Sequence, residues 1–130
     1  ATFEITESTF AATVQQPGIV LLDWWAPWCG PCRSFGPIYE KVSEKYPDVK
    51  FGKINTESEQ SLAAAFEIRS IPTLMVLRDS VIVYAQPGLV PERALDGIIK
   101  QVQGLDMDKI RKEMEHAQQN PQRPAANVPA

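Results

Sequence analysis

The chain contains little cysteine and little histidine. Its 130 residues include two cysteines, Cys29 and Cys32, and one histidine, His116. Two cysteines so close in sequence would enclose too small a loop to stabilise a fold much, because that stabilisation grows with loop length. A structural zinc site needs four protein ligands, which these three residues do not supply. The composition therefore excludes a disulfide scaffold, argues against a metal site and leaves His116 as a surface residue.

A long apolar run and an excess of positive charge are also missing. The apolar run 19–22 is far shorter than the roughly 18 residues that indicate a membrane span. The 13 basic and 16 acidic residues give a net charge of −3, and the basic ones are scattered along the chain. We therefore expect no membrane association and no nucleic-acid binding. The segment that begins at Ala1 shows no secretory leader pattern, which favours a cytoplasmic location.

What the sequence does contain is an alternation of strand and helix patterns. Residues 19–25 are apolar on both faces, which is typical of a central strand covered by helices. Pro31 stands where a helix opens, and apolar residues then recur at spacings of three and four as far as Tyr46. The remaining patterns indicate a strand at 3–5, a helix after Thr6, a strand at 49–54, a short helix at 58–66 that turns Leu62, Ala65 and Phe66 inward, a hairpin of 73–77 and 81–85 joined by 78–80, and a helix after Pro91. This order predicts an α/β fold with a mixed central β-sheet flanked by helices on both faces.

The pattern changes near Gln103. We predict one domain over residues 1–103, an amphipathic helical extension over 104–120 and a disordered tail over 121–130. Met107, Ile110 and Met114 lie at helical spacing in the extension, and packing against the chain's own domain is favoured over partner binding. The tail has three prolines and no aromatic residue, a composition that cannot form a packed core.

The two cysteines lie between a predicted buried strand and a predicted helix. In the segment Trp28-Cys29-Gly30-Pro31-Cys32, the first sulfur stands at a helix N-terminus. Unpaired N–H groups there stabilise a thiolate and lower the pKa of Cys29, which makes it the expected nucleophile. Cys32 lies one turn further on, less accessible but within disulfide reach, so we expect it to resolve a mixed disulfide.

Asp23 is anomalous because it follows four aliphatic residues in a strand that ought to be buried. Burial favours the protonated carboxyl, so Asp23 is a candidate to accept a proton from Cys32 and to return it. Lys53, on the neighbouring strand, would tune this carboxyl. The alternative is a carboxylate that only pairs with Lys53 and takes no part in chemistry. We favour the catalytic role, because strand pairing would bring both residues beneath the cysteines.

The segment from Asp23 to Cys32 resembles the active site of the thioredoxin family, and Ile71-Pro72-Thr73 resembles the cis-proline loop of that family. The resemblance extends over about residues 3–102. It includes Pro37, which matches the proline that bends the active-site helix, and Lys53. Three positions depart from the family pattern: Ser80 replaces a common glycine, Pro87 a common aliphatic residue, and Trp24 the usual phenylalanine.

The resemblance implies a thioredoxin fold and an enzyme that reduces protein disulfides through Cys29 and Cys32. It implies no bound cofactor and no metal, since electrons would come from NADPH through a flavin-dependent thioredoxin reductase. Expected partners are that reductase and disulfide-containing target proteins, and we expect a monomer. Targets would dock on a surface formed by Trp28, Gly30, Pro31, Ile71, Pro72, Thr73, Gly88 and Leu89.

Two alternatives remain open. Oxidases and isomerases of this class would run the exchange in the opposite direction, but they usually carry histidine between the cysteines, where this chain has Gly30 and Pro31. A thioredoxin-like binding or co-chaperone module would instead use the domain and the tail helix to dock a partner.

Overall fold

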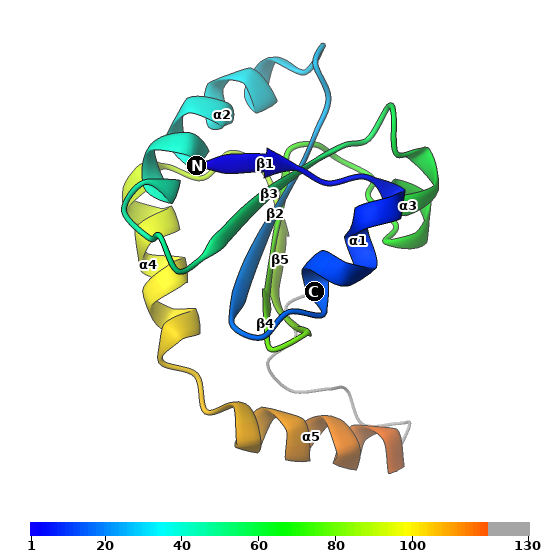
Figure 1. Cartoon of the computed structure of the whole chain (residues 1–130), viewed down its shortest axis with the longest axis vertical. Coiled ribbons are helices and arrows are strands. Elements are labelled where there is room, and N and C mark those ends of the chain that lie inside the picture. The colour runs from blue at the N-terminus through cyan, green and yellow to red at the C-terminus, as the bar shows by residue number, and fades with distance from the viewer. Residues whose placement is uncertain (120–130) are drawn as a thin grey trace.

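A computed structural model describes residues 1–119 of the chain. The tail predicted at 121–130, and residue 120 at the end of the predicted extension, lie outside the described residues. The elements run in the order β1 (Thr2–Glu4), α1 (Glu7–Val14), β2 (Ile19–Trp25), α2 (Gly30–Ser43), β3 (Lys50–Asn55), α3 (Gln60–Ala65), β4 (Thr73–Arg78), β5 (Val81–Pro87), α4 (Glu92–Gln103) and α5 (Met107–Gln119) (Figure 1).

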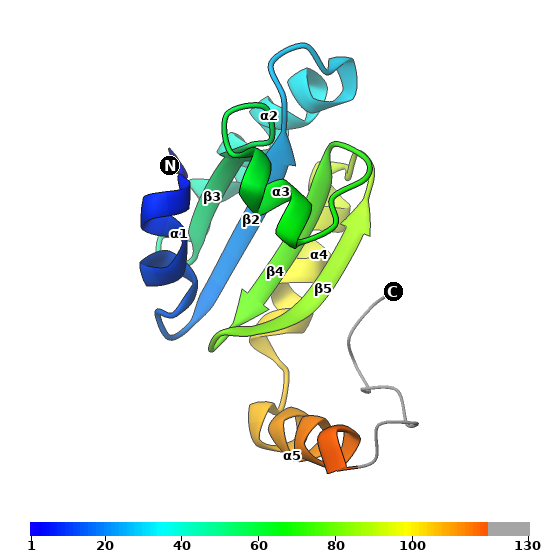
Figure 2. The same cartoon turned by 90° about the vertical axis from the view of Figure 1, so that its right-hand side faces the viewer.

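The five strands form one sheet in the order β1-β3-β2-β4-β5. The strand β2 is parallel to β3 and antiparallel to β4, so the sheet is mixed, as predicted. Helices α2 and α4 cover one face and helices α1 and α3 cover the other (Figures 1 and 2). The α/β architecture expected from the sequence is therefore confirmed.

Each face of the sheet has its own core, because successive side chains of a strand point to opposite faces. Leu21 belongs to the core under α2 and α4, whereas Leu22 belongs to the core under α1 and α3, and both are fully buried. The second core corrects one prediction. Ala65 is exposed, and Ala63 packs inward in its place, because α3 spans six residues and turns position 65 to solvent.

The β4–β5 hairpin turns more tightly than the sequence indicated. Arg78 is the last residue of β4, so the loop has two residues, Asp79 and Ser80, with φ of 50° and 70°. Two-residue hairpin loops favour this left-handed conformation because it matches the twist of the strands. The turn also contacts the α1–β2 connection, since the N–H of Gly18 donates to Oδ1 of Asp79 at 2.8 Å.

The predicted helix after the domain is present as α5. Its residues Met107 and Ile110 are buried in the same core as α2 and α4, and Met114 packs against that core. The guanidinium of Arg78 donates to the three carbonyl oxygens of Val102, Gln103 and Leu105, at 2.7, 3.1 and 2.9 Å. The expectation that the apolar stripe packs against the chain's own domain is confirmed. No helix within residues 1–119 is long and apolar enough to cross a bilayer.

Candidate active site

Cys29 and Cys32 form a disulfide at the start of α2, with their Cα atoms 5.2 Å apart. Cys29 is the N-cap residue of the helix, and its sulfur accepts a hydrogen bond of 3.2 Å from the N–H of Cys32. Pro31 occupies the first turn, where its missing N–H removes no helical hydrogen bond. The helix continues through Pro37 to Ser43. The backbone thus directs an N–H group at the sulfur of Cys29, the arrangement that stabilises a thiolate.

Solvent exposure does not separate the two cysteines. Cys29 is 4% exposed and Cys32 is 3% exposed, so the predicted difference in access is small. Their positions do separate them, because Cys29 caps the helix and its sulfur lies 3.7 Å from the carbonyl oxygen of Ile71. In the reduced state the Cys29 thiol can donate to that carbonyl. The distinction between the sulfurs therefore lies in their backbone surroundings.

The loop beside the disulfide contains a cis peptide bond between Ile71 and Pro72, as the resemblance implies. The carbonyl of Pro72 accepts a hydrogen bond of 2.8 Å from the N–H of Gly88. Gly88 has φ of 108°, a conformation that residues other than glycine rarely adopt. The loops before β4 and after β5 are thereby joined next to the cysteines.

Most of the residues predicted to bind substrate lie on an open surface around the disulfide. Trp28 is 65% exposed and Leu89 is 49% exposed. Gly30, Pro31 and Gly88 are also exposed, Ile71 is half-buried, and Pro72 and Thr73 are buried. The last two therefore shape the loop and offer little side-chain surface of their own.

Glu57, a residue that was not predicted from the sequence, holds Trp28 in place. Its Oε1 accepts a hydrogen bond of 2.6 Å from the indole N–H of Trp28. Parallel strands end at the same edge of a sheet, and β2 is parallel to β3. The residues that follow β3 therefore lie next to those that follow β2, and this register was the signal for Glu57.

Asp23 is completely buried in β2, and neither of its carboxyl oxygens has a hydrogen-bonding partner within residues 1–119. Burial raises the pKa of Asp23 from the ordinary 3.8 to about 7. Lys53 acts in the opposite direction, and Glu4 adds to the rise. Asp23 can therefore gain or lose a proton close to neutral pH.

Lys53 is aligned with Asp23 across the β2–β3 pair, as strand pairing predicted. Its ammonium nitrogen lies 4.4 Å from the centroid of the Trp25 ring, a cation–π contact. In the described part of the chain no ion pair joins Lys53 to Asp23. The alternative in which Asp23 is simply held by an ion pair does not match this geometry.

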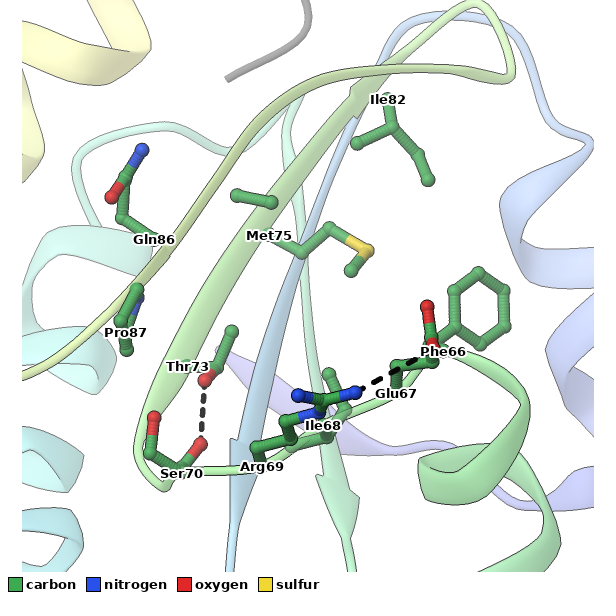
Figure 3. A pocket seen from close by; sticks show the side chains of 11 residues that line it. Phe66, Glu67, Ile68, Arg69, Ser70, Thr73, Met75, Ile82, Gln86 and Pro87 are labelled. Carbon is green, nitrogen blue, oxygen red and sulfur yellow. Dashed lines mark hydrogen bonds and ion pairs between the residues drawn. The ribbon is translucent and has the colours of Figure 1, made fainter. Parts of the chain in front are cut away.

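A hollow of about 550 Å³ opens beside β5 and the loop that precedes Pro72 (Figure 3). Phe66, Ile68 and Met75 give it an apolar lining, and Glu67 and Arg69 form an ion pair of 3.9 Å at its edge. Neither this hollow nor the one beside Gly18 is lined by a cysteine. Residues 1–119 contain no group of three or more His, Cys, Asp or Glu side chains that could hold a metal ion.

Comparison with known sequences agrees with the family resemblance of the cysteine motif and the cis-proline loop. The sequence model of the family described as thioredoxin matches residues 1–102. A protein of Streptomyces coelicolor named "Putative thioredoxin 2" is 54% identical over 112 residues, which cover 86% of this chain and 84% of that protein. "Thioredoxin 1" of Synechococcus elongatus is 44% identical over 93 residues, with 70% of this chain and 87% of that protein covered.

A third relative, "Thioredoxin" of Bacillus subtilis, is 37% identical over 100 residues, which cover 76% of this chain and 95% of that protein. The Streptomyces match spans 112 residues and the family match ends at residue 102. The Streptomyces match must therefore include part of the segment after Val102. That segment, to which α5 belongs, is shared at least in part with this relative.

Proposed function

The chain belongs to the thioredoxin family, and from that premise we propose that its cysteine pair passes electrons to the disulfides of target proteins. Thioredoxins are protein disulfide oxidoreductases, and this chain has their fold and a cysteine pair at disulfide distance, so it performs thiol–disulfide exchange. The observation that carries the proposal is the placement of Cys29 as N-cap residue of α2, with the N–H of Cys32 directed at its sulfur.

Two exchange steps account for the reduction. The thiolate of Cys29 attacks one sulfur of the target disulfide, so that a mixed disulfide forms and the other target sulfur leaves as a thiolate. Cys32 then attacks the sulfur of Cys29 and releases the second target sulfur. Two electrons pass to the target, which takes up two protons as it becomes a dithiol. The Cys29–Cys32 disulfide that remains is the state described here.

Asp23 and Lys53 serve the second step. Cys32 must lose a proton before it attacks, and Asp23 can accept one because burial raises its pKa to about 7. Lys53, aligned with Asp23 on β3, stabilises the charged carboxylate form of Asp23 that is present before this proton is accepted. These two residues therefore set the pH range in which the mixed disulfide is resolved.

Proteins fit this site better than small molecules do. The cysteines lie on a surface bordered by exposed Trp28 and Leu89, and neither described hollow is lined by a cysteine. An extended target segment can lie across this surface and pair with the backbone at Ile71, in the manner of an added strand. Trp28, Gly30, Pro31, Gly88 and Leu89 would form the docking area.

The reducing direction follows from Gly30 and Pro31, since oxidising members of this class usually carry histidine between their cysteines. The oxidised pair must be reduced again, and we assign this step to a flavin-dependent thioredoxin reductase that uses NADPH. Thioredoxins need no cofactor of their own. We propose that the chain acts as a cytoplasmic monomer, which can reach both the reductase and many different target proteins.

A coupled assay tests direction and partner together. The chain, NADPH and a thioredoxin reductase are mixed with insulin, and oxidation of NADPH is followed by absorbance. We expect NADPH oxidation that depends on insulin, on the reductase and on the chain, and that disappears in the Cys29→Ser variant. If the chain stays oxidised with every flavin-dependent reductase tested, yet oxidises dithiols in proteins, the reducing assignment is wrong.

The second candidate is a binding module, which the exposed Trp28 and Leu89 and the apolar hollow would suit (Figure 3). A double variant, Cys29→Ser with Cys32→Ser, separates the two functions. Catalysis predicts that this variant loses all cellular function, whereas a docking role predicts that it keeps it. Full function in the double variant would favour the binding module.

A further inference from the structure

Three charged residues form a row across the sheet. Glu4 on β1 is the aligned partner of Lys53 on β3, and Lys53 is the aligned partner of Asp23 on β2. Aligned residues on neighbouring strands point to the same face of a sheet. The row therefore has two carboxyl groups with one ammonium group between them. It leads from fully buried Asp23, through half-buried Lys53, to exposed Glu4.

Lys53 is positioned between the two carboxyl groups without pairing with either in the described residues. In the described part of the chain no ion pair joins it to Asp23 or to Glu4, and its ammonium instead lies over the Trp25 ring. A lysine side chain is flexible and carries a single charge, so it cannot neutralise both neighbours at once. Negative charge at Glu4 therefore competes with negative charge at Asp23 for the same cation.

We propose that Glu4 is a positioning residue for the proton transfer of Asp23: its carboxylate draws Lys53 towards solvent and disfavours negative charge on Asp23. The inference rests on the proposed function of Asp23 in resolving the mixed disulfide. The pKa shifts of Asp23 and Glu4 agree with this proposal. Glu4 raises the pKa of Asp23, while Lys53 lowers it. Lys53 also lowers the pKa of Glu4, against the larger effect of burial, as expected for a shared cation.

The other titratable groups near the row are engaged elsewhere. On α2, the hydroxyl of Tyr39 donates to the carbonyl of Gly52, and the carboxylate of Glu40 accepts from the N–H of Thr2. Glu59, which precedes α3 and raises the pKa of Glu4, accepts from the N–H of Glu7. Cys29 and Cys32 are joined to each other at the start of α2. Besides Asp23, Glu4 is the carboxyl group aligned directly with Lys53 on a neighbouring strand.

The test is a direct titration of the Asp23 carboxyl group by carbon NMR in the oxidised full-length chain, which requires no activity. Glu4→Gln removes the charge and keeps the shape of an exposed side chain. We expect the Asp23 midpoint to fall by about half a pH unit, the size of effect expected from one like charge two strands away in a partly solvated site. Glu4→Asp keeps the charge and should restore the midpoint. Glu7→Gln makes the same charge change away from the row and should leave the midpoint unchanged.

The inference is overturned if Glu4→Gln leaves the Asp23 midpoint where it is, or if Glu7→Gln moves it equally. The pH dependence of mixed-disulfide resolution provides a separate readout, which should move to lower pH with the Asp23 midpoint. A midpoint that moves while this rate profile stays fixed would support the coupling between Glu4 and Asp23. That result would instead contradict the role of Asp23 in the proposed function.

Discussion

The indole N–H of Trp28 donates a hydrogen bond of 2.6 Å to Oε1 of Glu57, although Trp28 is 65% exposed. The bond fixes a large apolar side chain at the border of the disulfide surface. An exposed side chain of this size would otherwise sample several rotamers and would have to be ordered when a target binds. Glu57 therefore orders Trp28, part of the proposed docking surface, before a target binds.

Replacing Glu57 with alanine should weaken the docking of protein substrates. The lost hydrogen bond contributes about 1 kcal/mol, which corresponds to a roughly fivefold higher KM for insulin. A small disulfide reagent should react at an unchanged rate, because it does not need to contact the Trp28 side chain. Glu57→Gln keeps an acceptor oxygen and serves as the control. Equal KM values for insulin in the Glu57→Ala variant and the parent chain would show that Glu57 does not prepare the surface.

Asp23→Asn should stabilise the oxidised protein above neutral pH. The folded chain holds the Asp23 proton up to a pKa of about 7, whereas the ordinary value is 3.8. Between these values the unfolded chain loses the proton and the folded chain keeps it, so stability falls as pH rises through this window. Across this window the free energy of unfolding falls by up to about 4 kcal/mol, and the Asp23→Asn variant shows no such fall. Denaturant unfolding at pH 4 and pH 8 measures it, and equal slopes with pH in both proteins would contradict it.

The same variant should slow the resolution of the mixed disulfide more than its formation. Cys32 loses its proton acceptor, whereas the attack by Cys29 does not require one. Stopped-flow measurement of target release, compared with single-turnover formation of the mixed disulfide, separates the two steps. Equal slowing of both steps would remove Asp23 from the proposed role.

Ser80→Gly should stabilise the hairpin. Ser80 adopts φ of 70°, where a side chain costs about 1 kcal/mol that glycine does not incur. We expect a gain of about 1 kcal/mol in the free energy of unfolding, measured with denaturant. Ser8→Gly is the matched control: Ser8 lies in α1, where the same change should instead cost about 0.5–1 kcal/mol. A loss of stability in both variants would contradict the account of the turn.

Removing residues 104–130 should destabilise the domain without impairing its chemistry. Met107 and Ile110 are buried in the core, and each contributes about 1.5–3 kcal/mol through its burial. The helix α5 lies at the end of the sheet opposite to the start of α2 (Figures 1 and 2). Insulin reduction at 25 °C should therefore be unchanged. In the full chain, Met107→Ala with Ile110→Ala should reproduce the loss of stability, and exposed Lys109→Ala should not. A truncated chain as stable as the parent would refute the packing role.

Much of this architecture could be predicted from periodicity. The doubly apolar run 19–25 indicated a central strand, and spacings of three and four indicated the helices, because one buried face dictates each pattern. The motif around Cys29 identified the site itself. The wrong inward placement of Ala65 arose because α3 is so short that its orientation depends on the packing of Phe66 and not on periodicity.

Most side-chain contacts between distant segments could not be predicted. The bond from Trp28 to Glu57 and the row from Glu4 to Asp23 depend on the register of β1, β2 and β3. The sequence places Lys53 near Asp23 but does not show that its ammonium lies over Trp25. That choice depends on side-chain packing, which no local pattern encodes.

The central claim is that Cys29 attacks target disulfides and Cys32 resolves the intermediate. The most direct measurement is the trapping of mixed disulfides with a target protein, identified by mass spectrometry of the linked peptides. We predict that Cys32→Ser accumulates a stable adduct through Cys29, and that Cys29→Ser accumulates almost none. Adducts formed equally through Cys32 in the Cys29→Ser variant would contradict the assignment of the two sulfurs.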